Sequence, residues 1–106
     1  AIRRLLAYEA AGADVLFAPG LRRLEDIRRV CGALRRPVNV MAGFPDSGFT
    51  LRDLAAAGVK RVSLAASLYR AALTGMEEAA REVMEQGTFT YAGRILRSDA
   101  LRPHLR

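Results

Sequence analysis

Residues 13–20, ADVLFAPG, contain the pattern that decides the fold: a short apolar run that ends in a Pro-Gly turn. Short apolar runs occupy residues 14–18, 38–41 and 61–65, about 23 residues apart. Parallel strands need a crossover helix between them, so strand, loop and helix together set a period of roughly 20 to 35 residues. The spacing therefore predicts successive strand–helix units of a parallel α/β sheet.

Between these runs, apolar residues recur at spacings of three and four, the period of a helix. The residues predicted to point inward are Ile2, Leu5, Leu6 and Ala10 in a first helix, Leu24, Ile27, Cys31 and Leu34 in a second, and Ala72, Leu73, Met76, Ala80, Val83 and Met84 in a long helix from about Leu68. Thr50 with Asp53 predicts a capping box that starts a short helix over residues 51–57. Glycines are expected to end three of these helices: Gly12, Gly58 and Gly87.

Three parallel strands in 106 residues leave the edges of the sheet open. A complete eight-stranded α/β barrel takes roughly 250 residues, and the chain opens inside a helical pattern without an initiator Met. We therefore expect the chain to be the back part of something larger and to supply fewer than half of the units of such a barrel. We expect residues 92–106 to be a basic tail that is partly disordered or contains a short helix near Ser98.

The formal charge of +6 does not indicate a nucleic-acid partner. Half of this net charge lies in residues 94–106, and only Lys60 among the 17 basic residues is a lysine. The basic residues do not form a stripe interleaved with aromatics, which is typical of nucleic-acid binders. The single Cys31 excludes an internal disulfide and fits a reduced compartment. No apolar run reaches the roughly 20 residues of a membrane span. We expect a cytoplasmic protein with no membrane partner.

Alternation along the predicted strands separates two faces. Val38 and Val40 are expected to pack on the helices, so Asn39 points to the other face, as Ser63 does in the third strand. In such sheets ligands bind outside the carboxyl ends of the strands. These ends are residues 18–20, 41–43 and 65–67.

The substrate-binding candidates at these ends are Gly20, Asn39, Gly43 and Ser67. For Asn39, contact with substrate and a purely structural amide bond stay open. For Ser67, capping of the last long helix competes with a ligand contact. The catalytic residues are not assigned.

Other chemistry-bearing residues have structural explanations. Cys31 lies on an apolar helix stripe and is expected to be a packing thiol, and His104 has no second ligand at metal spacing. Residues 43–48 lack the lysine and the spacing of a P-loop. The carboxylates of the long helix are expected on a solvated face: Glu77, Glu78, Glu82 and Glu85.

Three phrases in this order, residues 10–21 (AAGADVLFAPGL), 36–43 (RPVNVMAG) and 54–64 (LAAAGVKRVSL), resemble the second half of the isocitrate lyase and phosphoenolpyruvate mutase superfamily. The resemblance is to the branch that includes methylisocitrate lyases, phosphonomutases and oxaloacetate decarboxylases. The resemblance covers residues 1–91 and implies that they are the C-terminal part, strands six to eight, of a (β/α)8 barrel. It implies an enzyme that cleaves or forms a C–C or P–C bond through a pyruvate enolate. It also implies Mg²⁺ held by acidic residues on earlier strands, a small carboxylic acid as substrate, and a homodimer or homotetramer that exchanges its eighth helix between subunits.

The chain departs from this family in two places. Cys31 is not the cysteine of the lysine-lysine-cysteine-glycine-histidine loop of the lyases, and residues 41–48 replace their asparagine-x-threonine-glutamate-phenylalanine-glycine phrase. Two other functions therefore stay open: a non-catalytic homologue that binds a small carboxylate, and a different, phosphate-binding barrel. By itself, this chain is expected to have no Mg²⁺-dependent lyase activity.

Overall fold

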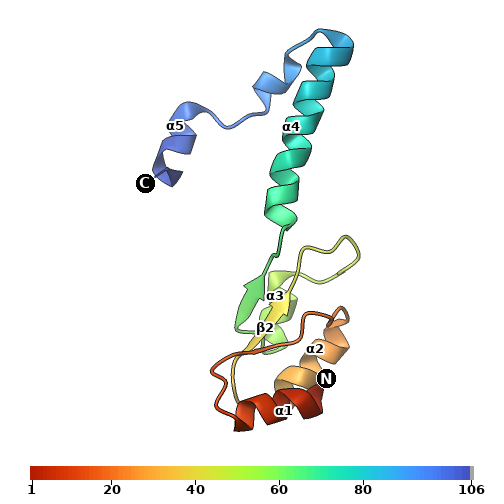
Figure 1. Cartoon of the computed structure of the whole chain (residues 1–106), viewed down its shortest axis with the longest axis vertical. Coiled ribbons are helices and arrows are strands. Elements are labelled where there is room, and N and C mark those ends of the chain that lie inside the picture. The colour runs from red at the N-terminus through yellow and green to blue at the C-terminus, as the bar shows by residue number, and fades with distance from the viewer. Residues whose placement is uncertain (106) are drawn as a thin grey trace. The chain divides into compact units, whose positions relative to one another are not determined.

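A computed structural model describes residues 1–105, and the chain divides after Leu68 into two compact units. The first unit alternates helices and strands in the predicted order (Figure 1). Its elements are α1 (Ile2–Ala10), β1 (Leu16–Phe17), α2 (Leu24–Ala33), β2 (Val38–Met41), α3 (Leu51–Ala56) and β3 (Arg61–Ser63).

The three strands form one parallel sheet in the order β1-β2-β3, which confirms the predicted α/β class. Strand β2 has the predicted bounds, but β1 and β3 are shorter than the predicted 14–18 and 61–65. Pro19 has no N–H to extend the ladder beyond β1. Ala65 has a φ of 48°, a left-handed conformation that takes the backbone out of β3.

The core lies between one face of this sheet and the three helices. Strand residues on that face and helix residues from α1, α2 and α3 form a single buried cluster: Leu5, Leu16, Ile27, Val30, Val38, Val40, Leu54, Ala57 and Val59. Val62 packs against the same cluster. The predicted outward packing of Val38 and Val40 is therefore confirmed.

Polar contacts fix the ends of the helices in this unit. The Glu9 carboxylate accepts hydrogen bonds from the backbone N–H groups of Arg35 and Arg36 at 2.9 and 2.7 Å, which ties α1 to the turn before β2. Thr50 and Asp53 form the predicted capping box of α3. Hydrogen bonds from the Thr50 side chain and backbone lower the pKa of the Asp53 carboxyl.

Cys31 lies where α2 meets the end of α3. Gly58 has a φ of +93°, and a Cβ built on it would lie 3.2 Å from the Cys31 Cβ, so the two segments are closely packed here. The thiol is half-buried, and burial raises its pKa. This location agrees with the predicted packing role.

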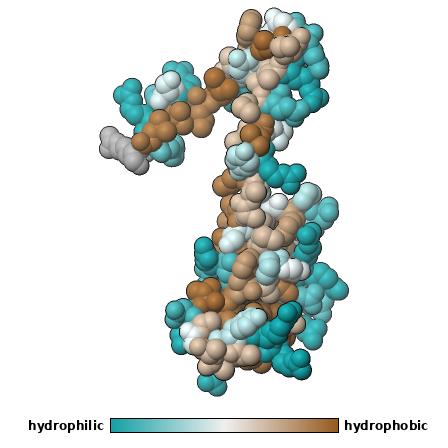
Figure 2. Space-filling view, viewed as in Figure 1, coloured by the Kyte–Doolittle hydropathy of each residue, from teal (hydrophilic) through white to brown (hydrophobic). Residues whose placement is uncertain are grey.

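The second unit contains most of α4 (Ser67–Gln86), followed by η1 (Thr90–Gly93), α5 (Ser98–Leu101) and η2 (Arg102–His104). The long helix ends before Gly87, as predicted, and α5 lies near Ser98, where a short helix was one of two alternatives for the tail. The prediction that the apolar residues of α4 are buried is wrong, because Leu73 is 39% exposed and Met76 is 64% exposed. Helical periodicity identifies which residues share an apolar face, but it does not identify what covers that face. Apolar residues reach the surface along α4 and the segment after it (Figure 2).

Glu82 also differs from the prediction of a solvated face, because it is only 8% exposed. Its carboxylate accepts hydrogen bonds from the Thr88 hydroxyl at 2.8 Å, from the Thr90 backbone N–H, and from the Tyr91 backbone N–H at 3.1 Å. Glu82 thus joins the last turns of α4 to η1. Desolvation acts to raise its pKa, but these hydrogen bonds together outweigh it and lower the pKa.

The position of Glu82 predicts a pH dependence in the second unit. Because the folded-state pKa is lowered, ionised Glu82 stabilises the turn fully above the ordinary glutamate pKa, and this contribution is lost as the pH falls through the lowered value. Amide resonances of Thr90 and Tyr91, followed by NMR during acidification, should shift with a midpoint below that of a free glutamate. Glu82→Gln should abolish this midpoint and speed amide exchange at neutral pH, whereas Glu85→Gln, an exposed carboxylate on the same helix, should do neither.

Candidate functional site

The predicted ligand-binding ends lie on one edge of the sheet. Because β1, β2 and β3 are parallel, residues 18–20, 41–43 and 65–67 follow the strands at the same, carboxyl edge. Asn39 and Ser63 lie on the face of the sheet away from the core, together with Phe17, which pairs with Asn39 in the register. A polar pair on this face, beside loops at the carboxyl edge, is the arrangement in which α/β proteins hold small ligands.

Asn39 has a specific partner. Its side chain is 3% exposed, its Nδ2 donates to the Ser63 Oγ at 2.9 Å, and the Ser63 hydroxyl donates to the Asn39 Oδ1 at 3.1 Å. Ser63 thus fixes the orientation of the Asn39 amide. The structural amide bond that sequence reasoning left open is present, and the contact between Asn39 and a ligand stays a prediction.

Gly43 and Ser67 meet at the carboxyl edge. Gly43 has a φ of +87°, and a Cβ built on it would lie 2.7 Å from the Ser67 Oγ. The predicted helix cap at Ser67 is wrong, since Ser67 is the first helical residue of α4 and its hydroxyl donates to the Leu64 carbonyl at 2.7 Å. The left-handed backbone at Ala65 turns the chain so that Ser67 already lies within the helix.

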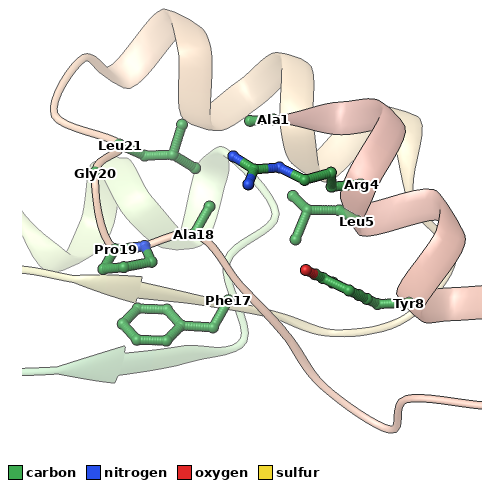
Figure 3. A pocket seen from close by; sticks show the side chains of 9 residues that line it. All are labelled: Ala1, Arg4, Leu5, Tyr8, Phe17, Ala18, Pro19, Gly20 and Leu21. Carbon is green, nitrogen blue, oxygen red and sulfur yellow. The ribbon is translucent and has the colours of Figure 1, made fainter.

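Gly20 lines a cavity that none of the other three candidates lines. This cavity has a volume of about 470 Å³ and is bounded by α1 on one side and by β1 and the loop after it on the other. Figure 3 shows Arg4 and Tyr8 of α1 facing Phe17 and Pro19 across it. It adjoins β1, which has a strand neighbour on one side only.

A contact between two of the edge loops was not predicted from the sequence. The Arg22 guanidinium lies 4.1 Å from the centroid of the Phe44 ring. Arg22 belongs to the loop between β1 and α2, and Phe44 to the loop between β2 and α3. The available signal was an arginine and an aromatic residue placed shortly after the ends of two neighbouring strands.

A second apolar groove lies between α3, the loop before it and the end of β3, and Gly43, one of the substrate-binding candidates, lines it. It has a volume of about 400 Å³, and its walls include Phe49, Leu51, Leu54, Val62 and Leu64. Leu51 and Leu64 are exposed. The groove is therefore open to another apolar surface.

Residues 1–105 contain neither a cluster of metal ligands nor a membrane-spanning helix. No three His, Cys, Asp or Glu side chains within this range come together as metal ligands. None of the helices in the same range is both long and apolar enough to cross a lipid bilayer. The described residues therefore do not fit a Mg²⁺ site on their own.

Residues 1–84 match the model of the phosphoenolpyruvate phosphomutase family. The chain is 33% identical to the 2-methylisocitrate lyase of Aeropyrum pernix over 92 residues, which are 83% of this chain and 29% of the relative. It is 31% identical to the oxaloacetate decarboxylase of Paraburkholderia xenovorans over 90 residues, 85% of this chain and 29% of that protein. The chain thus spans less than a third of the length of these curated relatives.

Solved structures share the fold. A lyase/mutase-like protein from Burkholderia cenocepacia superposes with a TM-score of 0.89 and 43% identity, over 99% of this chain and 38% of its own. An oxaloacetate acetylhydrolase superposes with a TM-score of 0.79 over 95% of this chain and 36% of its own, at 20% identity.

Because Gly43 lies close to Ser67, replacing Gly43 should destabilise the protein more than replacing Gly48, another glycine of the same loop. Gly43→Ala should lower the free energy of unfolding by about 2 kcal/mol or more, because it adds a steric clash to a left-handed backbone. Gly48→Ala should cost only about 1 kcal/mol, because Gly48 also has a positive φ, +61°, but its Cβ would meet nothing within 4 Å. Chemical denaturation of both variants measures the difference, and equal losses would contradict the close approach.

Proposed function

Since the chain belongs to the phosphoenolpyruvate phosphomutase family, we propose that it supplies strands six to eight of a (β/α)8 barrel. This barrel cleaves or forms a carbon–carbon or phosphorus–carbon bond in a small α-keto or 2-hydroxy carboxylic acid. The names of the two curated relatives, a 2-methylisocitrate lyase and an oxaloacetate decarboxylase, support a substrate of this class.

The observation that carries the proposal is the oriented amide of Asn39. A buried amide that is held by Ser63, on the sheet face away from the helices, can present a fixed dipole to an oxygen of the substrate. Fixed donors cost no reorganisation when negative charge develops on an enolate oxygen, so they stabilise the transition state more than water does. The roles proposed for this chain are therefore binding and orientation of the substrate.

The metal expected for this reaction does not enter these roles. The described residues form no cluster that fits Mg²⁺, so we propose that any metal ligands come from strands outside residues 1–105. No step of the chemistry is assigned here to a metal.

The cavity beside α1 and β1 fits the same barrel assignment. In a barrel every strand has two neighbours, and β1 has one. We propose that a preceding strand packs against this open side of β1, next to the cavity that contains Gly20. This assignment makes Gly20 a packing residue and leaves Asn39, Gly43 and Ser67 as the substrate-binding candidates.

A chimeric enzyme tests the function. This chain would replace the aligned C-terminal segment of the Aeropyrum pernix 2-methylisocitrate lyase, and pyruvate release from 2-methylisocitrate would be measured. Asn39→Ala in the chimera should lower kcat/KM by about 10-fold or more with a small loss of melting temperature. Val40→Ala, on the same strand but in the core, should cost about 2 kcal/mol of stability with little change in kcat/KM.

Three outcomes would count against parts of this proposal. A folded chimera that neither releases pyruvate nor binds it would overturn the assignment to this enzyme class. Unchanged kinetics in Asn39→Ala, together with a large loss of melting temperature, would reduce Asn39 to a structural residue. Pyruvate release by the 106-residue chain alone, above a blank, would contradict the proposal that essential residues lie outside it.

We also propose that the protein is a homodimer or homotetramer held in part by α4. The exposed apolar residues of α4, such as Leu73 and Met76, present an apolar face for a second copy to cover. Sedimentation velocity at micromolar concentration should show an oligomer, and Met76→Lys should weaken it, whereas Glu78→Lys on the same helix should have a smaller effect. A stable monomer at that concentration would contradict this proposal.

A further inference from the structure

Arg61, the first residue of β3, points to the face of the sheet that carries Asn39. Val62 packs against the core, so its two neighbours in the strand, Arg61 and Ser63, point the opposite way. The register agrees, because Arg61 pairs with Asn39, and the hydrogen bonds between Ser63 and Asn39 place both side chains on this face. A permanent cation is therefore the register neighbour of a buried amide.

Arg61 has no counter-ion within residues 1–105. The arginines that form ion pairs in this range are Arg23, Arg81 and Arg97. The Arg61 side chain is exposed instead. The other described strand residues that share its face include no acidic residue: Phe17, Asn39, Met41 and Ser63.

The barrel proposed above changes the surroundings of Arg61. The interior of a (β/α)8 barrel is filled with packed side chains, so closure of the barrel turns this face inward and away from solvent. A guanidinium does not lose its proton in proteins, and a charge removed from water needs a partner of opposite sign. A carboxylate of the protein meets this need better than a ligand does, because Arg61 begins β3 and ligands bind at the opposite, carboxyl edge.

The free edge of β3 is the side on which such a carboxylate can lie. On one side, Arg61 neighbours Asn39, whose amide is already engaged by Ser63. On the other side, β3 has no strand neighbour among the described residues, whereas every strand of a barrel has two. Residues paired across neighbouring strands point to the same face about 5 Å apart, which is within reach of an arginine side chain.

We propose that Arg61 forms an ion pair with an aspartate or glutamate on the strand that joins the free edge of β3. This strand lies outside residues 1–105, and its carboxylate shares the inner face of the barrel with Arg61 and Asn39. The inference rests on the barrel of the proposed function and goes beyond it, because it gives the neighbouring strand a chemical requirement. The ion pair helps to fix the register in which the barrel closes.

A chimera with the lyase/mutase-like protein of Burkholderia cenocepacia tests this inference, since that protein superposes on 99% of this chain and has further strands to complete the barrel. This chain would replace the superposed segment, and melting temperatures would be measured at pH 7 and pH 4. At pH 7, Arg61→Met should lower the melting temperature by about 8 °C or more, because it leaves a carboxylate unpaired in the interior. The loss should shrink at pH 4, where an unpaired buried carboxylate takes up a proton.

Matched variants separate the ion pair from a general effect of charge. Lys60→Met, which removes the exposed cation just before β3, should change the melting temperature by less than about 2 °C at either pH. Arg61→Lys keeps the charge and should lose less than half as much as Arg61→Met. In the 106-residue chain alone, where the edge of β3 is free, Arg61→Met should have no pH-dependent effect.

Charge reversal identifies the partner. Arg61→Glu would be combined in turn with an Asp→Arg or Glu→Arg substitution at each acidic residue of the strand next to β3 in the chimera. One combination should recover at least half of the melting temperature that Arg61→Glu alone loses, because the pair is restored with its charges exchanged.

Each contrary outcome has a definite meaning. No loss in Arg61→Met at pH 7, or an equal loss at pH 7 and pH 4, would overturn the ion pair and leave the proposed function standing. A loss that appears only when pyruvate is added would also overturn it, since Arg61 would then face a ligand. A chimera that does not fold even with Arg61 unchanged would overturn the barrel on which both proposals rest. These readouts are independent of the pyruvate release that tests the proposed function.

Discussion

The alternation of side chains along β2 is the constraint on which the rest of this structure depends. Val38 and Val40 lie in the core against the helices, while Asn39, between them, is equally buried on the opposite face. A shift of one residue in the strand register would place the Asn39 amide among the apolar side chains and remove both valines from the core. Burying an amide without a hydrogen-bond partner costs free energy, so the shifted register is disfavoured. The native register places Asn39 beside Ser63.

The sequence predicts those parts of the fold that local rules determine. The bounds of β2, the capping box of Thr50 and Asp53, and the glycine after α4 all depend on residues a few positions apart. The ends of β1 and β3 were not predicted, because they depend on backbone conformation near Ala65 and Pro19 rather than on hydrophobicity. Helical spacing also does not reveal that Glu82 turns inward, because its partners lie in the irregular segment after α4.

The candidate site was predicted less completely than the fold. Strand alternation identifies Asn39 and Ser63 as residues of one face, but not the hydrogen bonds between them. The contact of Arg22 with Phe44 joins loops that follow different strands, and no periodic pattern relates those two positions. Loops at the carboxyl edge vary without loss of the sheet. Sequence rules therefore identify the edge of the sheet at which the candidate residues lie better than they identify the contacts between side chains there.

The close packing between α2 and α3 gives the only thiol of the chain a use as a reporter. Thiolates, not thiols, react with alkylating agents and disulfides, so the raised pKa of half-buried Cys31 keeps its reactivity low at neutral pH. Gly58 leaves little free space beside the Cys31 Cβ, which hinders a bulky reagent from entering while the helices stay packed. Loosening of the packing between α2 and the segment at Gly58 should therefore raise the rate of alkylation at this natural position, without any introduced label.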